Sequence, residues 1–163
     1  MDENVDLEQG PVTKNDDEAY MLEALKQAEA ALSSKDEPVG AVIVSGSRIV
    51  ARAHHQVKLL KDPTAHAAII AITQAASSLN TAQLNKAVLY VTQEPGVMDL
   101  GAIFLSGVAR LVYGAADSKY GACGSVVDLT SNERLNRKMS VTRGVLASEC
   151  HTILRKAASG ATI

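Results

Sequence analysis

Short apolar runs rich in β-branched residues alternate with longer segments of helical periodicity along most of this chain. The first run covers residues 39–44, and a turn at 45–47 leads directly into a second run at 48–53. Two further runs, 87–92 and 109–113, each follow a segment whose apolar residues recur at helical spacing. Because strands that alternate with helices are typical of a sheet covered by helices, this order predicts a layered α/β domain.

Four helices are expected around these runs. The spacing of apolar residues predicts them over 16–33, from 64 or 65 to about 79, over 97–106 and over 144–158. Loops are expected at 54–63, 80–86 and 114–124, and the last of these is rich in glycine. That loop lacks the glycine and lysine spacing of the phosphate-binding motifs, so we do not expect it to hold a nucleotide phosphate.

The charge distribution separates the beginning of the chain from the rest. Residues 1–18 carry a net charge of −6, and the remaining residues carry +4. We therefore expect residues 1–14 to form a flexible acidic leader and 15–163 to form one domain. The chain has no apolar run of membrane length and no secretory signal, and its two cysteines are far apart, so a cytoplasmic protein is expected.

Two short segments indicate a particular chemistry. They read Asp-Pro-Thr-Ala-His-Ala-Ala at 62–68 and Glu-Pro-Gly-Val-Met-Asp at 94–99. Zinc nucleobase deaminases carry H-x-E and P-C-x-x-C motifs, in which the His and the two Cys hold zinc and the Glu moves protons. His66 and Pro95 match these motifs. The remaining positions differ: Ala68 stands at the Glu, and Gly96 and Asp99 stand at the two Cys.

The chain resembles the cytidine-deaminase-like superfamily and, within it, the bacterial tRNA adenosine deaminases. The resemblance spans about residues 19–156 and rests on the runs 37–44, 61–67, 88–92, 112–117, 121–125 and 141–150. It implies a three-layer α/β/α fold with a mixed sheet of about five strands. It also implies a homodimer that pairs through the helix at 97–106, which carries Val97, Met98, Phe104 and Leu105.

The changed motif positions predict a chain without the family's chemistry. A methyl group at Ala68 cannot carry a proton, Gly96 has no side chain, and His66 with Asp99 makes only two metal ligands. We therefore expect no catalytic residue, no metal and no other cofactor. The first hypothesis is a catalytically degenerate homologue that binds RNA, such as tRNA, or a protein partner, such as an active deaminase subunit.

Two alternatives remain open at this stage. Two imidazoles and a carboxylate suit zinc, so His55, His66 and Asp99 could form a rebuilt metal site, with Gly96 at the remaining ligand position. His55 stands where relatives carry an Asn that lines the base pocket. The chain would then be an active hydrolase of the cytidine, deoxycytidylate or tRNA adenosine deaminase type. In the other alternative, the same three residues line a pocket that binds a small ligand.

Basic residues near the C-terminus give a weaker indication of RNA binding. In relatives, comparable residues approach the tRNA, and here the set comprises Arg137, Lys138, Arg143, Arg155 and Lys156. The chain has no Trp, one Phe and four Tyr, so we expect base stacking to be limited. Cys123 and Cys150 do not occupy motif positions and are expected to be buried small residues.

Overall fold

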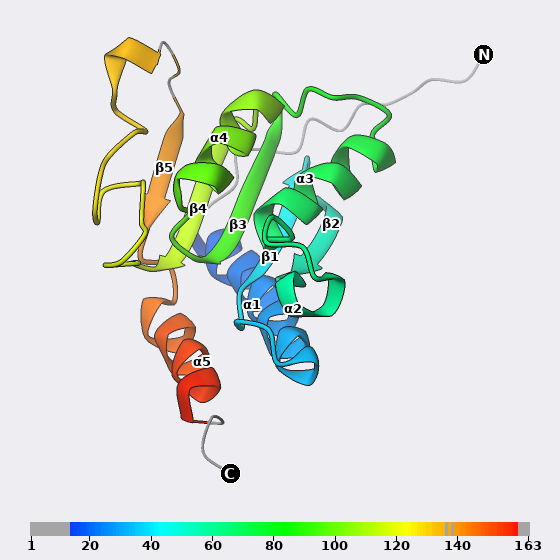
Figure 1. Ribbon diagram of the computed structural model, residues 1–163. Coiled ribbons are helices and arrows are strands. Elements are labelled where there is room, and N and C mark those ends of the chain that lie inside the picture. Colours follow the sequence, from blue (N-terminus) through cyan, green and yellow to red (C-terminus); the bar gives the residue numbers. More distant parts are fainter. Residues whose placement is uncertain (1–13, 136, 138, 160–163) are drawn as a thin grey trace, which may run out of the picture.

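A five-stranded mixed sheet forms the centre of the computed structural model, which describes residues 14–159 except 136 and 138. The strands are β1 (Gly40–Ser45), β2 (Arg48–His54), β3 (Ala87–Gln93), β4 (Arg110–Ala115) and β5 (Ser140–Arg143). Their order is β2-β1-β3-β4-β5 (Figure 1). β1 runs antiparallel to both of its neighbours, whereas β3, β4 and β5 are mutually parallel.

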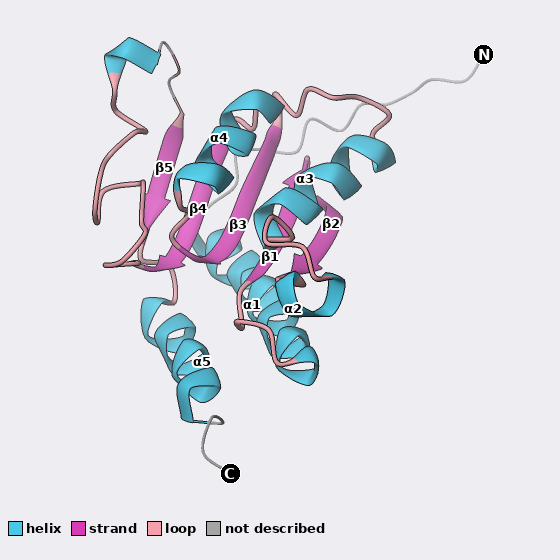
Figure 2. Ribbon diagram, in the orientation of Figure 1, coloured by secondary structure: helices cyan, strands magenta, loops and turns pink. Residues whose placement is uncertain are grey.

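Helices cover both faces of this sheet (Figure 2). α1 (Lys14–Ala31) packs on β1 and β3, and α5 (Ala147–Ser159) packs on β4 on the same face. α3 (Ala67–Ser78) lies on the opposite face against β2 and β1, with α4 (Val97–Ser106) beside it. A one-turn helix, α2 (Val57–Leu60), links β2 to α3. The predicted three-layer α/β/α fold is therefore confirmed.

Two hydrophobic cores separate the layers, and β1 contributes to both. Because successive side chains of a strand point to opposite faces, Ala41 and Ile43 join the core under α3 and α4, while Val42 and Val44 join the core under α1. The contact with α1 is very close at Gly40. A Cβ atom there would lie 2.0 Å from the carbonyl oxygen of Ala24, so only glycine allows this approach.

The element boundaries differ from the predicted ones where the backbone turns. α5 begins at Ala147 instead of 144, because Gly144 and Leu146 adopt left-handed conformations with φ of 78° and 51°. α3 begins at Ala67 because His66 is extended and precedes the helix as its N-cap. The predicted loop at 54–63 contains α2, and the polar edge strand β5 had no apolar run to indicate it.

Several smaller expectations can be compared with the described residues. Cys123 and Cys150 are free and buried, as predicted, and burial raises the pKa of each thiol to about 12. The predicted leader, 1–14, lies outside the described residues apart from Lys14, where α1 begins. In the described part of the chain, no helix is long and apolar enough to cross a membrane. The cytoplasmic location stays a prediction.

A buried ion pair ties α1 to the sheet. The carboxylate of Asp17, which is 4% exposed, accepts hydrogen bonds from both terminal nitrogens of Arg110 on β4, at 2.9 and 2.6 Å. It also accepts the hydroxyl of Tyr90 on β3 at 2.8 Å. Arg110 in turn donates to Thr142 on β5 at 2.7 Å. This network joins one helix to three adjacent strands.

We expect Asp17→Asn to destabilise the fold by about 3 kcal/mol, because an amide would face the Arg110 guanidinium and leave its charge uncompensated. The measurement is the free energy of unfolding in urea. Glu18→Gln, on the exposed side of the same helix, is the matched control and should change stability by less than about 0.5 kcal/mol. Equal effects of the two substitutions would contradict a structural role for the network.

Candidate functional site

The strand directions bring five chain segments together at one edge of the sheet, the edge formed by the carboxyl ends of β2 and β3. β3 ends there, and α4 begins a few residues later. Because β1 is antiparallel to β3, the start of β1 lies at this edge, and so does the end of β2. His55 follows β2, and its backbone N–H donates to the carbonyl of Val39 at 3.0 Å. α3 then starts at the same edge, which places His66 beside His55.

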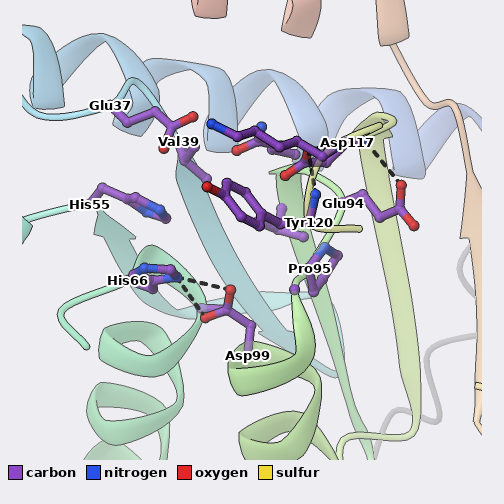
Figure 3. Close-up of a pocket in the computed structure, with 14 residues that line it drawn as sticks. Glu37, Val39, His55, His66, Glu94, Pro95, Asp99, Asp117 and Tyr120 are labelled. Atoms are coloured by element: carbon purple, nitrogen blue, oxygen red, sulfur yellow. Dashed lines mark hydrogen bonds and ion pairs between the residues drawn. The ribbon is translucent and has the colours of Figure 1, made fainter. Parts of the chain in front are cut away.

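A hydrogen-bonded pair, His66 and Asp99, stands at the meeting point of α3 and α4 (Figure 3). The Nδ1 atom of His66 lies 2.9 and 3.1 Å from the two carboxylate oxygens of Asp99. Asp99 is in the first turn of α4, where a negative charge is favoured by the helix dipole, and the residue is 8% exposed. The hydrogen bond to Asp99 raises the pKa of His66 above its usual value, although burial opposes this effect.

His55 supports His66 by stacking. The two imidazole rings are 4.4 Å apart and inclined by 26°. The Nδ1 atom of His55 accepts the backbone N–H of Ala67 at 3.0 Å, so the ring proton of the neutral form is on Nε2. Burial, followed by the nearby His66, lowers the pKa of His55 to about 4. His55 is therefore a neutral donor beside an imidazole that readily becomes charged.

The three residues line a cavity of about 470 Å³, which is large enough for a nucleoside. The structure thus brings His55, His66 and Asp99 together. The cavity is also lined by Ala68 and Gly96, the other changed motif positions, and by the motif proline, Pro95. The remaining lining residues were not selected as site residues from the sequence: Glu37, Val39, Val91, Gln93, Glu94, Asp117, Lys119 and Tyr120.

Glu94 holds the loop on the far side of this cavity. Its buried carboxylate accepts the backbone N–H groups of Asp117 and Cys123 at 2.9 Å each, that of Ser125 at 3.1 Å, and the Ser125 hydroxyl. Burial would raise the pKa of Glu94, but these hydrogen bonds outweigh it and the pKa is lowered. No role was assigned to Glu94 from the sequence. Its position directly before the motif proline was the available signal.

The residues at the motif positions do not fit a zinc ion in this arrangement. His66 Nδ1 is bonded to Asp99, His55 Nδ1 is bonded to Ala67, and Gly96 offers no donor atom. Among residues 14–159, leaving out 136 and 138, no group of three or more His, Cys, Asp or Glu side chains is placed to hold a metal ion. In this arrangement His66 and Asp99 form a hydrogen-bonded pair.

The basic residues predicted to bind RNA do not line the cavity. Arg143 donates to the carbonyl of Cys123 at 3.0 Å and pairs with Asp128 at 3.6 Å, so it fastens the loop. Arg155 is exposed on α5, and Lys156 lies on the same helix beside α1. Arg137 is exposed, and Lys138 lies outside the described residues. RNA binding by this set stays a prediction.

Comparison with known proteins extends the resemblance over most of the chain. A sequence model of the MafB19-like deaminase family matches residues 15–149. A tRNA-specific adenosine deaminase of Bacillus subtilis is 42% identical over 138 residues, which are 85% of this chain and 86% of that protein. The enzyme of the same name from Streptococcus pyogenes is 35% identical over 145 residues, covering 89% of this chain and 91% of that protein.

Solved structures of deaminases also match the fold of this chain. One from studies of A-to-I editing by tRNA:A34 deaminases at the wobble position has a TM-score of 0.80 and 38% identity, covering 83% of this chain and 98% of that one. A guanine deaminase from Nitrosomonas europaea has a TM-score of 0.77 and 25% identity, covering 87% of this chain and 84% of that one.

These findings correct the first functional hypothesis. A catalytically degenerate homologue that only binds RNA or a partner was predicted from a few motif positions, Ala68 and Gly96 foremost. The long matches to proteins named as deaminases overturn that prediction and point to a deaminase. The physical reason for the error is that residue types were weighed one at a time, without the contact that joins His66 to Asp99. The chain belongs to the MafB19-like deaminase family.

Proposed function

We propose that this protein is a deaminase-type hydrolase that acts on an adenine base of tRNA, with His66 and Asp99 as its acid–base pair. One observation carries the proposal: a hydrogen-bonded His–Asp pair forms part of the wall of a nucleoside-sized cavity. The names of the relatives support the choice of substrate and reaction.

The pair can move a proton between water and the leaving group. Asp99 accepts a hydrogen bond from the Nδ1–H group of His66, which leaves Nε2 to take up and release a proton. The carboxylate stabilises the imidazolium that forms. The hydrogen bond to Asp99 is also the main cause of the raised pKa of His66. His55, neutral and stacked on His66, restricts the orientation of the His66 ring.

The proposed reaction balances with one water molecule. Water adds to C6 of the adenine ring as His66 Nε2 takes its proton, and a C–O bond forms. The electron pair of the opened C6=N1 bond goes to N1, and His66 delivers the proton there. The hydroxyl proton of the adduct then passes through His66 to the exocyclic amine, the C–N bond breaks, C6=O forms, and ammonia leaves a hypoxanthine base protonated at N1. General acid–base catalysis by a positioned side chain typically contributes about 10²–10⁴-fold, so we expect a modest rate.

A second copy of the chain is proposed as the partner of α4. Val97, Met98 and Leu105 are exposed apolar residues on this helix. Exposed apolar side chains on one helix favour burial against another protein surface. These three residues, together with the half-buried Phe104, were expected at a homodimer interface from the family resemblance.

We expect His66→Ala and Asp99→Asn each to reduce inosine formation in tRNA by at least about 10²-fold, because either change removes the acid–base pair. The measurement is single-turnover conversion with the protein in excess over tRNA. His151→Ala, an exposed histidine on α5, is the control and should retain the wild-type rate. No conversion by the wild-type protein, or equal rates for all variants, would contradict the proposal.

A second prediction concerns the motif positions themselves. A Cβ atom at Gly96 would contact only the carbonyl oxygen of Tyr120, at an ordinary 3.4 Å, and φ of −80° suits any residue. The triple variant Ala68→Glu, Gly96→Cys, Asp99→Cys should therefore fold and free His66 to bind metal. We expect about one zinc per chain by elemental analysis after dialysis.

Ala68→Glu alone is the matched control for this variant, because it adds a carboxylate to the cavity wall without adding a thiolate. It should take up much less zinc than the triple variant. A folded triple variant that holds no zinc would show that His66 and the two helix starts are not spaced as the family resemblance implies.

A further inference from the structure

Tyr120 and Lys119 are consecutive exposed residues on the loop between β4 and β5, and both line the mouth of the cavity. Figure 3 shows the Tyr120 ring among the lining residues. Tyr120 is 64% exposed, although it is one of few aromatic residues in the chain. The ammonium of Lys119 lies 5.0 Å from the centre of its ring, at a distance typical of a cation–π contact. An aromatic ring and a positive charge are thus presented together to solvent.

The backbone beneath these two side chains is held firmly. Asp117 accepts the backbone N–H groups of Lys119 and Tyr120 at 2.9 and 3.1 Å. The backbone N–H of Asp117 in turn donates to the buried carboxylate of Glu94. Gly121 packs so closely on Glu94 that a Cβ atom there would lie 2.4 Å from its carboxyl carbon. These contacts therefore fix the backbone of the loop that carries Tyr120 and Lys119.

This place is where an RNA strand must pass if its base enters the cavity. A base bound beside His66 remains joined to its strand, so an adjacent nucleotide has to lie at the mouth. Proteins that bind single-stranded nucleic acid use aromatic faces for bases and cations for the backbone. Of the described residues that line the cavity, Lys119 is the only lysine or arginine.

We propose that Tyr120 stacks on the nucleobase adjacent to the one held in the cavity, and that Lys119 pairs with the phosphate between them. This inference rests on the proposed function, because it requires a base of an RNA strand in the cavity. The pair would form a second binding subsite that favours a strand over a free nucleoside. Stacking is tolerant of sequence, so the subsite requires an adjacent base without reading its identity.

The test compares RNA stem-loops that differ at a single nucleotide. One carries an intact loop around the target adenosine, and two others carry an abasic residue on its 5′ or its 3′ side. Dissociation constants are measured by fluorescence anisotropy for the wild-type protein, Tyr120→Ala and Tyr120→Phe. Val126→Ala is the matched control, since this residue is exposed on the same loop but does not line the cavity.

We expect Tyr120→Ala to weaken binding of the intact loop about tenfold, and Tyr120→Phe and Val126→Ala to leave it unchanged. With one of the two abasic loops, Tyr120→Ala should bind as well as the wild-type protein, because the base that it contacts is missing. Lys119→Met should make the plot of log binding constant against log salt concentration less steep, by about the amount that corresponds to one phosphate contact.

The outcomes separate this inference from the proposed function. If the wild-type protein converts the target adenosine but Tyr120→Ala binds all three loops like the wild type, the stacking subsite is overturned and the proposed function stands. An equal loss for intact and abasic loops also overturns it, because the loss would not depend on a neighbouring base. If the wild-type protein neither binds nor converts the intact loop, both proposals fail.

Discussion

The antiparallel placement of β1 between β2 and β3 is the constraint on which the rest of the structure depends. It turns the end of β2 and the end of β3 toward one edge, where α3 and α4 also begin. His55, His66 and Asp99 are therefore neighbours although up to 44 residues separate them in the sequence. The close contact at Gly40, which permits no side chain, helps to fix β1 against α1. Any shift of β1 would move His55 relative to His66.

Two buried carboxylates at this edge of the sheet, Glu94 and Asp99, have different bonding partners and different roles. Glu94 accepts hydrogen bonds from the backbone and one hydroxyl, so it stays charged and holds the loop that carries Tyr120. Asp99 bonds to an imidazole that can gain or lose a proton, so its environment changes as His66 titrates. The first arrangement gives the cavity a fixed wall, and the second gives it a group able to transfer protons. Together they give the cavity the fixed wall and the ionisable group that the proposed reaction requires.

The sequence predicted the fold well because its strands are short, apolar and clearly separated by helical segments. It did not predict β5, whose four residues alternate weakly at an edge of the sheet. His55, His66 and Asp99 could be selected as pocket residues through the family resemblance, but the bond between His66 and Asp99 is a long-range contact without a local signal. Tyr120 was missed for a similar reason: only the loop hydrogen bonds show that an exposed side chain is held at the cavity. The functional prediction was wrong because the changed residues were judged without these contacts.

The protonation of the two imidazoles tests the central claim most directly. Long-range ¹H–¹⁵N spectra of protein labelled at histidine report which ring nitrogen carries the proton, and spectra of His66→Ala assign the signals. We predict a proton on His66 Nδ1, shared with Asp99, and a neutral His55 with its proton on Nε2. A His66 whose Nδ1 carries no proton near neutral pH would contradict the acid–base pair.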